Sequence, residues 1–585
     1  MKKLATYILS LLVIFAAHSQ YYLRGEITDE KNQPLSNVKI VLYSTHNVYA
    51  SGASGGFGIE IRTLNDSLTL SLEGYEIKTV AVRSDQYQHL ELKVLAANSS
   101  NNKPKLISIT KDLKQENKFR QYVNDESYFQ IVENEYANAE KFPNTGFSLN
   151  VNKASYSNIR RFLNMGSTVP PDAVRTEELL NYFNLYNRPP QQGDLFNIHS
   201  QVTSCPWNQQ RQLLFLNMTA KKLNLERFPA GNFVFLIDNS GSMDLPNRLP
   251  LLKAAFQMLV KNLREKDTVS IVTYGGGVSI WMQPTSGGEK DKILKSIEAL
   301  EAGGDTPGES AIMTAYALAE STFIKGGNNR VILATDGDFN VGKISEKALE
   351  ELITKERQTG VYLTCLGVGM GNYKDSKLET LAKRGNGNSA YLDDIHEAEK
   401  VLVKELTQTF YAVADNVFMN VQFNPEVVKE YRLIGFDNKK DAIADPNGEL
   451  EGGEIGSGSS VMAMFEIIPK DSATKDPTAN IAKVNMRYNA CGDTARRYLK
   501  YTCPQNFVDF NVADSELRFG TALTMFALKL KQSRYIKEVD WDDIERIATS
   551  AIEPGNYLQN EFIQLIEKAK KIYVTRKIKK KRKEE

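Results

Sequence analysis

Uninterrupted apolar runs alternate with helical patterns in the middle of the chain, from residue 227 to residue 409. Residues 233–237, 331–334 and 361–368 are such runs. They are typical of strands buried on both faces of a parallel sheet. Helical patterns begin near residues 249, 290, 309, 346, 377 and 397. The alternation predicts an α/β, Rossmann-like domain with helices on both faces of a mostly parallel sheet. Residues 278–282 follow strand 268–274 too closely for a crossover, which predicts an antiparallel edge strand.

The hydrophobic pattern differs on either side of this region. Residues 20–96 show short alternating strands separated by turns, which predicts a small β-sandwich. Residues 97–122 are rich in Asn, Ser and Lys with little periodicity, and we interpret them as a linker.

Strand patterns before and after the α/β region suggest a shared sheet. Residues 123–226 contain a strand leading into a helix, a second helix after Pro170-Pro171, and two strands within residues 198–220. Residues 410–572 return to strands and end in helical patterns at 515–531 and 540–572. If these strands form one sheet or sandwich, the α/β domain is inserted in, rather than merely flanked by, a mainly β domain with C-terminal helices.

The two ends of the chain have special compositions. Lys2 and Lys3 precede an apolar run, and Ala17 and Ser19 occupy the positions that a signal peptidase recognises. Residues 1–19 are therefore predicted to be a signal peptide cleaved before Gln20, with an uncleaved anchor helix as the alternative. Residues 573–585 form a basic tail, which predicts a solvated, frayed terminus, with contact to anionic lipid or nucleic acid as the alternative.

Charge and cysteine content narrow the function classes. The formal net charge of +1 argues against general nucleic-acid binding. Because the predicted signal peptide is followed by no stretch that is apolar enough to span a bilayer, we expect an exported product of the periplasm, cell envelope or cell surface. Export permits disulfides. Cys365 lies in an apolar strand and is predicted to be a buried thiol, whereas a bridge between Cys491 and Cys503 is feasible but not decided by the sequence.

Oxygen-bearing side chains follow two of the buried strands. Asp238, Ser240 and Ser242 alternate after the run 233–237, and Asp336 follows the run 331–334. Thr306 lies in a Gly-rich loop before a helix. Side chains at the carboxyl ends of sheet strands lie where open α/β folds bind ligands. Hydroxyl and carboxylate oxygens suit Mg²⁺, which keeps several waters.

These five residues, in this order and spacing, resemble the metal-ion-dependent adhesion site of von Willebrand factor type A domains. The resemblance implies that Ser240, Ser242 and Thr306 bind the ion through hydroxyls, while Asp238 and Asp336 act mostly through water. It also implies Mg²⁺ as the cofactor, with Mn²⁺ or Ca²⁺ as substitutes. An Asp or Glu carboxylate from a partner protein would fill the open coordination position. A strand followed by a Ser/Asp turn without any metal is the alternative.

Two further resemblances cover the rest of the chain. The pattern from Gly25 through Pro34 to Val38, with Gly74-Tyr75, resembles the carboxypeptidase regulatory-like domain, a transthyretin-like sandwich. The regions 123–226 and 410–572 resemble the flanking domains of one bacterial, exported type A family.

The predicted function is therefore metal-dependent protein binding rather than catalysis, with no catalytic residue assigned. The chain has five histidines and no HExxH motif. A hydrolase using the same cation and a purely structural metal site are the rival hypotheses. The sequence does not identify the partner or the oligomeric state.

Overall fold

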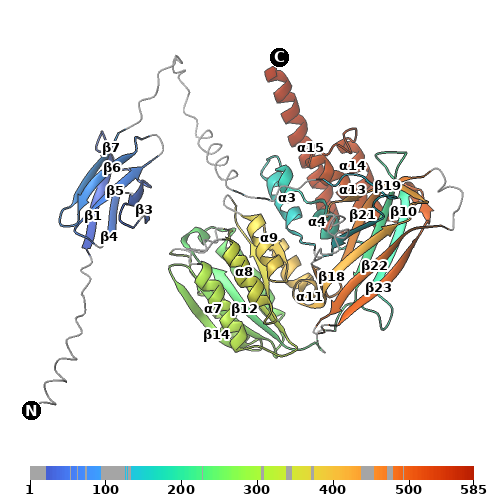
Figure 1. Ribbon diagram of the computed structural model, residues 1–585, viewed down its shortest axis with the longest axis horizontal. Coiled ribbons are helices and arrows are strands. Elements are labelled where there is room, and N and C mark those ends of the chain that lie inside the picture. Colours follow the sequence, from blue (N-terminus) through green and yellow to red (C-terminus); the bar gives the residue numbers. More distant parts are fainter. Residues whose placement is uncertain are drawn as a thin grey trace, which may run out of the picture. The chain divides into compact units, whose positions relative to one another are not determined.

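The computed structural model describes residues 21–45, 47–52, 54–61, 63–72, 75–93, 126, 128, 133–149, 151–224, 226, 228–304, 308–337, 346–370, 374–436, 453–470, 479–491, 493 and 495–584. The chain forms two compact units, Met1–Thr110 and Lys111–Glu585 (Figure 1). The predicted signal peptide and the whole of the predicted linker lie outside the described residues.

The smaller unit is a β-sandwich, as predicted. One sheet has the order β4-β1-β7 and the other the order β3-β2-β5-β6. Alternate side chains of the strands fill the space between the sheets, so that Leu23, Ile27, Ile40 and Leu68 are fully buried. The strands are β1 (Tyr21–Asp29), β2 (Lys39–Leu42), β3 (Val48–Ala50), β4 (Gly56–Ile61), β5 (Asn65–Ser71), β6 (Lys78–Arg83) and β7 (Gln88–Leu92).

The larger unit contains the predicted α/β domain, whose sheet has the order β14-β13-β12-β15-β16-β17. The strands are β12 (Gly231–Asp238), β13 (Thr268–Tyr274), β14 (Val278–Ser286), β15 (Asn328–Thr335), β16 (Val361–Gly367) and β17 (Ser389–Tyr391). All neighbours are parallel except β13 and β14, which confirms the antiparallel edge.

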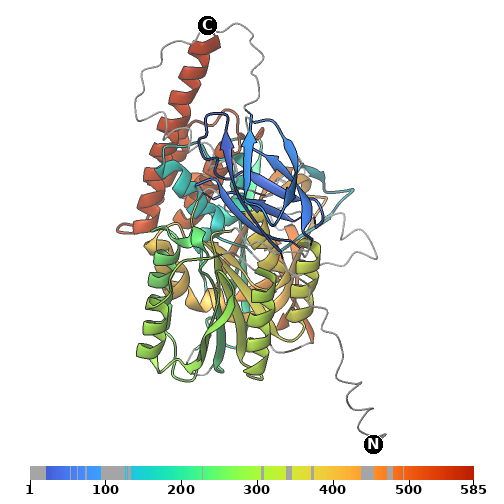
Figure 2. The same ribbon diagram turned by 90° about the vertical axis from the view of Figure 1, so that its left-hand side faces the viewer.

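Helices cover both faces of this sheet (Figure 2). Phe233, Phe235 and Ile237 of β12 belong to the core on one face, and Val234 and Leu236 to the core on the other. An apolar run without alternation is therefore what this central strand requires. The helices are α5 (Leu249–Lys261), α6 (Lys290–Glu298), α7 (Gly308–Ser321), α8 (Glu346–Arg357), α9 (Asp375–Arg384), α10 (Ile395–Glu399) and α11 (Leu406–Phe410).

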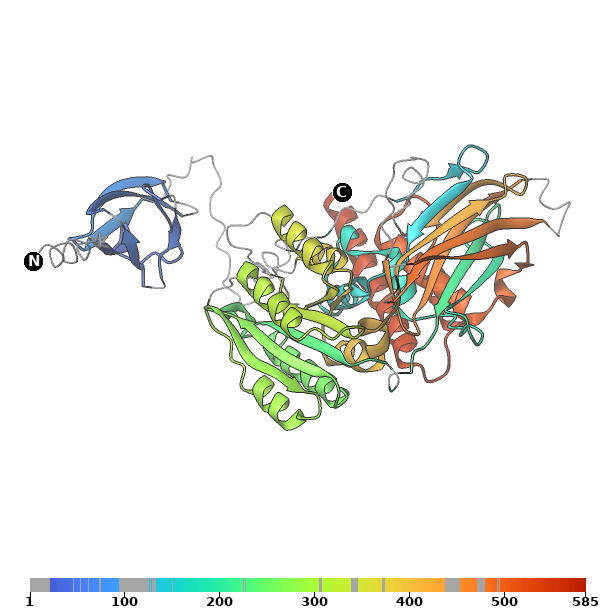
Figure 3. The same cartoon turned by 60° about the horizontal axis from the view of Figure 1, so that its bottom comes forward.

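The remaining strands of the larger unit form a second sandwich, in which early and late segments of the chain lie side by side (Figure 3). One sheet has the order β24-β10-β11-β21-β19-β8, and the other has the order β20-β18-β22-β23 with β9 against β18. Their bounds are β8 (Ala137–Asn138), β9 (Asn144–Ser148), β10 (Phe196–Ser204), β11 (Gln212–Ala220), β18 (Ala412–Phe423), β19 (Val428–Ile434), β20 (Gly453–Gly456), β21 (Ser460–Pro469), β22 (Asn480–Ala490), β23 (Arg496–Pro504) and β24 (Phe507–Val508).

This pairing confirms the insertion. Strand β11 precedes the α/β domain and pairs with β21, which follows it; β9 pairs with β18 in the same way. The regions before and after the α/β domain are therefore two halves of one sandwich. Asn328 shows that the ends of the inserted domain meet, because its backbone N–H donates to Ala230 O (3.1 Å) and its side chain donates to Phe410 O (2.6 Å).

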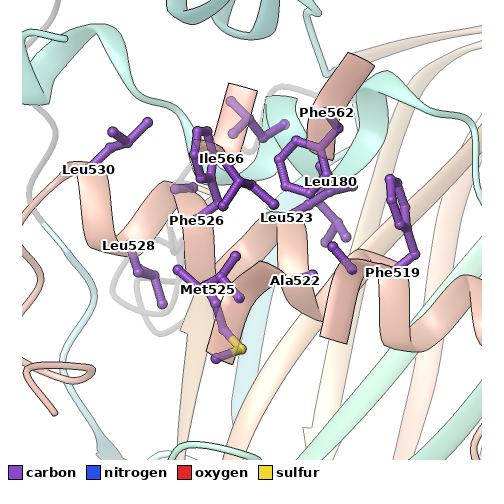
Figure 4. Packing of buried hydrophobic residues seen from close by; sticks show 14 of the residues in the cluster. Leu180, Phe519, Ala522, Leu523, Met525, Phe526, Leu528, Leu530, Phe562 and Ile566 are labelled. Atoms are coloured by element: carbon purple, nitrogen blue, oxygen red, sulfur yellow. The ribbon is translucent and has the colours of Figure 1, made fainter. Parts of the chain in front are cut away.

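Helices pack on the outer face of the first sheet of this sandwich. They are α3 (Ala154–Asn164), α4 (Thr176–Tyr182), α13 (Ser515–Leu530), α14 (Trp541–Thr549) and α15 (Tyr557–Glu584). Phe519, Leu523 and Phe526 of α13 pack against Phe562 and other apolar side chains (Figure 4). Nearly all of α13 is buried, which explains its weak amphipathicity.

Several details differ from the sequence expectations. The three-residue strand β17 was not predicted, and the predicted last helix of the α/β domain is divided by a π-helix at Lys400–Lys404. Helix α15 continues to Glu584, so the basic tail, predicted to be frayed, is helical. Lys and Arg favour helices and are stabilised near a helix C-terminus by the dipole.

The four cysteines are free thiols, and the feasible bridge does not form. Cys491 lies beside the turn between β22 and β23, whereas Cys503 is opposite Ala482 at the far end of this hairpin. The hairpin length separates them by about 24 Å, at ~3.4 Å per residue, which no disulfide spans. Cys365 is fully buried in β16, as predicted.

Candidate metal centre

Asp238 lies at the carboxyl end of the central strand β12, and its side chain is fully buried. Its Oδ1 accepts a hydrogen bond from the backbone N–H of Ser240 (3.0 Å), and its Oδ2 accepts one from the Thr335 hydroxyl (2.9 Å). Both carboxylate oxygens are thus held in fixed positions by neighbouring strand ends.

Ser240 and Ser242 follow in a tight turn that contains a 3₁₀ helix at Gly241–Met243. Their hydroxyl oxygens are 3.1 Å apart. Mg²⁺ binds oxygen octahedrally at ~2.0–2.1 Å, which places adjacent ligand oxygens roughly 2.9 Å apart. The two hydroxyls therefore have the spacing of neighbouring ligands of one such ion.

Asp336 follows β15 directly and is also fully buried. Its Oδ2 accepts a 2.5 Å hydrogen bond from Nη1 of Arg248, which also donates to the carbonyl oxygen of Ser242 (2.7 Å). Nη2 of the same arginine donates to the carbonyl oxygen of Met370 (2.9 Å). One guanidinium thus joins the Asp336 carboxylate, the serine turn and the segment after β16.

Thr306 lies outside the described residues, so its role stays a prediction. The loop that leads to it is held against the serine turn. Gly303 N–H donates to Asn239 O (2.7 Å), and Gly241 N–H donates to Gly304 O (3.0 Å). A Cβ atom on Gly304, whose φ is +80°, would lie 2.2 Å from Gly276 N, so this close approach requires glycine.

Without a bound cation, the surroundings of Asp238 disfavour the ionised form of its carboxyl. Burial raises the pKa of Asp238 to about 6, opposed by the hydrogen bonds from Ser240 and Thr335 and reinforced by the charge of Asp336. Burial also raises the pKa of the neighbouring Tyr274 well above its ordinary value, and the Asp238 charge adds to the shift. A nearby cation acts in the opposite direction and stabilises the ionised carboxylates.

The donor set fits a hard divalent cation. It offers hydroxyl and carboxylate oxygens, with no sulfur or imidazole. Within the described ranges no group of three or more His, Cys, Asp or Glu side chains has metal-binding geometry. Asp238, Ser240, Ser242 and Asp336, all predicted from the sequence, surround one end of the sheet.

Sequence reasoning missed Arg248, because its carboxylate partner, Asp336, lies far away in the chain. One local signal exists. Arg248 occupies the N-cap position of α5, where the helix dipole disfavours a positive charge. A cation at that position indicates a partner outside the helix, and here the partner is Asp336.

Family models match most of the chain. The von Willebrand factor type A domain model matches residues 232–409, and a further von Willebrand factor model matches 122–215. The model described as uncharacterized protein YfbK, C-terminal, matches residues 408–572, and the CarboxypepD_reg-like domain matches 23–106. Type A domains commonly mediate protein–protein interactions, often with a divalent metal, and are mostly non-enzymatic.

Three relatives are similar to this chain in sequence over different shares of its length. Uncharacterized protein YfbK of Escherichia coli is 37% identical over 467 residues, covering 76% of this chain and 80% of that protein. Inter-alpha-trypsin inhibitor heavy chain H2 of Mesocricetus auratus is 24% identical over 34% of this chain and 21% of its own length. The magnesium-chelatase 67 kDa subunit of Chlorobaculum tepidum is 25% identical over 37% of this chain and 39% of its own.

Solved structures include a von Willebrand factor type A protein from Catenulispora acidiphila, 14% identical, with a TM-score of 0.35 over 55% of this chain and 76% of that one. The ArnB paralog VWA2 from Sulfolobus acidocaldarius is 15% identical, with a TM-score of 0.33 over 65% of this chain and 98% of that one.

In the part of the chain that the structure describes, no helix has the length and apolar character needed to cross a membrane.

Proposed function

We propose that this chain, which belongs to the YfbK family of von Willebrand factor type A domain proteins, captures an acidic group of a partner protein through a divalent cation. The cation would be held by Asp238, Ser240, Ser242, Thr306 and Asp336. Mg²⁺ is the expected ion, with Mn²⁺ or Ca²⁺ as substitutes. The observation that supports this most directly is the 3.1 Å spacing of the two serine hydroxyls.

The charge balance of the site supports an anionic partner. Asp238 and Asp336 would neutralise a divalent ion, and Arg248 adds one positive charge beside Asp336. Counted over the described residues of the site, a bound cation would therefore leave a net positive charge in a buried setting, where unpaired charge is costly. A carboxylate from a partner Asp or Glu balances this charge.

The hydrogen bonds of Asp238 argue against the form of the rival hydrolase in which Asp238 is the nucleophile. A nucleophilic carboxylate needs an accessible oxygen, but both oxygens of Asp238 accept hydrogen bonds and the side chain is fully buried. If the hydrolase hypothesis were correct, phosphate-ester or peptide hydrolysis by the full chain would depend on Mg²⁺ and disappear in Asp238→Asn.

The test compares Ser240→Ala with Ser270→Ala, a matched control in the same sheet. Ser270 is fully buried in β13, and its hydroxyl has no hydrogen-bond partner among the described residues. Thermal unfolding is recorded in EDTA and in Mg²⁺ or Mn²⁺. An ion at ten times its Kd stabilises the native state by about 1.4 kcal/mol, a shift of a few degrees.

We expect this shift in the wild type and the control and its loss in Ser240→Ala. The cation-dependent, EDTA-reversible capture of a protein from a cell-envelope extract should follow the same pattern and should also be lost in Asp336→Ala. Capture retained in Ser240→Ala and Asp336→Ala would contradict the proposal. A shift that depends on Ser240 without any capture would favour a purely structural metal site.

Export to the periplasm or cell envelope is also part of the proposal. Residues 1–19 have the composition of a signal peptide. The mature protein recovered from its source should begin at Gln20 by N-terminal sequencing. A protein that retains Met1 in the cytoplasmic fraction would contradict this.

A further inference from the structure

A line of contacts joins helix α3, outside the inserted domain, to the candidate metal centre. It begins at Arg161 of α3, whose guanidinium lies 5.0 Å from the ring centroid of Tyr391. The Tyr391 hydroxyl donates a 2.5 Å hydrogen bond to Gly369 O. The next carbonyl, Met370 O, accepts from Arg248, which holds Asp336 and the serine turn. We call these residues, Arg161, Tyr391, Gly369, Met370 and Arg248, the contact chain.

The side chains of the contact chain are tightly confined. Arg161 and Arg248 are each 5% exposed, and Tyr391 is 1% exposed. A Cβ atom on Gly369, whose φ is +78°, would lie 2.5 Å from Nε of Arg248, so the arginine lies directly on this backbone. A displacement of the Gly369 segment therefore has to displace Arg248, because densely packed groups have no free space to absorb it.

The outer end of the contact chain is fixed by ion pairs. Arg161 donates to both carboxylate oxygens of Glu126 (2.6 and 2.8 Å) and to Asn158 (3.1 Å). Its neighbour Arg160 pairs with Asp393, two residues after Tyr391. Helix α3 is thus docked on the end of β17 by two adjacent arginines, and Tyr391 lies between this contact and the metal centre.

We propose that Tyr391 and Arg248 are positioning residues of the cation site. Through these two residues, the docking of helix α3 sets the affinity of the cation site for a divalent ion. This inference rests on the proposed function. The Tyr391 hydroxyl fixes the Gly369–Met370 segment, the Met370 carbonyl fixes Arg248, and Arg248 fixes Asp336 and the turn that contains Ser242. Because coupling between two sites is reciprocal, cation binding must in turn stabilise the docking of α3.

The first experiment measures the Kd for Mn²⁺ of the full chain by calorimetry for Tyr391→Phe and Tyr316→Phe. Tyr316 is the matched control, since it is a tyrosine of the same domain, is 1% exposed, and has a hydroxyl without a hydrogen-bond partner in the described part of the chain. We expect Tyr391→Phe to weaken Mn²⁺ binding about threefold to tenfold, the range of one lost hydrogen bond. Tyr316→Phe should leave the Kd within about 1.5-fold of wild type, because no hydrogen bond is lost. Equal Kd values for the two variants would overturn the inference.

A mutant cycle tests the role of helix α3. Arg161→Lys keeps a positive charge for Glu126 but removes the planar group over Tyr391. We expect it to weaken Mn²⁺ binding, and the double variant with Tyr391→Phe to bind no more weakly than Tyr391→Phe alone, since both changes interrupt one path. Additive losses would overturn the coupling.

Hydrogen exchange supplies a second readout, whose first part uses the wild type alone. In the wild type, Mn²⁺ should slow amide exchange in residues 154–164, and this protection should be lost in Tyr391→Phe. Unchanged exchange in α3 when Mn²⁺ is bound would overturn the inference and leave the proposed function intact. A wild type that binds neither Mg²⁺ nor Mn²⁺ would overturn both.

Discussion

Arg160 offers the sharpest test of how the inserted domain is fixed to its host. Its guanidinium donates to Asp393 (2.8 and 2.5 Å), to Glu397 (2.7 Å) and to Glu561 (3.1 Å). The four side chains are between 2% and 16% exposed. The perturbation is Arg160→Met, which keeps an apolar stem and removes the charge.

The expected loss of folding free energy follows from the carboxylates that stay buried without Arg160. Removing one partner of a buried ion pair costs about 3–5 kcal/mol, because the other charge stays buried without compensation. Three carboxylates share this arginine, which predicts the upper part of that range, about 4–5 kcal/mol, at pH 8.

The pH dependence has a definite sign. Burial raises the pKa of Asp393 to about 7 even though Arg160 lowers it. In the variant the folded pKa rises further. When the pKa of a carboxyl is higher in the folded state than in the unfolded state, the free energy of unfolding falls as the pH rises from about 4 to the folded-state pKa. The cost of the substitution should therefore shrink to about 3 kcal/mol at pH 6, since protonation removes the unpaired charge.

Urea unfolding followed by tryptophan fluorescence measures this cost. Trp207, Trp281 and Trp541 are the three tryptophans of the chain, and all belong to the larger unit, so the signal reports that unit alone. The control is Arg546→Met, whose pair with Asp543 is solvent-exposed and whose loss should cost less than about 0.5 kcal/mol. A cost for Arg160→Met below about 1 kcal/mol at pH 8, or one that does not change between pH 6 and pH 8, would refute the reasoning.

Three other predictions concern stability and thiol chemistry. Burial raises the pKa of Asp415 to about 6. The substitution Asp415→Asn should therefore increase the free energy of unfolding by about 1 kcal/mol at pH 8, after allowance for partial exposure, and should leave it unchanged near pH 4. A gain in urea unfolding that does not depend on pH would contradict this prediction. Phe526 is fully buried, with its ring centroid 5.2 Å from that of Phe562 and 5.9 Å from that of Trp541, so Phe526→Ala should cost about 3–5 kcal/mol in urea unfolding, and a cost below about 1 kcal/mol would be inconsistent with this core. Cys491 is exposed and free, so Ellman's reagent should modify one thiol in the native protein and four after denaturation; no native reaction, with two thiols after denaturation, would indicate a disulfide.

The sequence predicted what depends on local pattern. The apolar run of β12 identified a strand buried on both faces, and it correctly placed Asp238 at the carboxyl end of this strand, where open α/β folds bind ligands. Ser240 and Ser242 lie within the same turn, so their spacing was determined locally. Asp336 belongs to the same edge because β15 is the parallel neighbour of β12.

The features that the sequence did not predict depend on distant contacts. Arg248 meets Asp336 across 88 positions of the chain, and Arg160 meets Glu561 across 401. The strand β17 is only three residues long, too short for a periodic signal, and is defined by its pairing with β16. The separation of Cys491 from Cys503 became evident only when the register of β22 and β23 was known. In each case the determining feature is a pairing between two segments of the chain, and no local propensity records it.

The meeting of Ala230 and Phe410 at Asn328 has a consequence for the order of folding. The sandwich must join β11 to β18 across the whole inserted domain. The entropic free-energy cost of closing a flexible loop rises by about 0.6 kcal/mol for each doubling of the loop's length. An unfolded insert is a loop of roughly 190 residues, whereas a folded one, with its ends together, behaves as a loop of roughly a dozen. Four doublings separate the two lengths, so prior folding of the insert makes closure of the sandwich easier by about 2.5 kcal/mol. The insert is in this respect an internal folding aid for the domain that surrounds it.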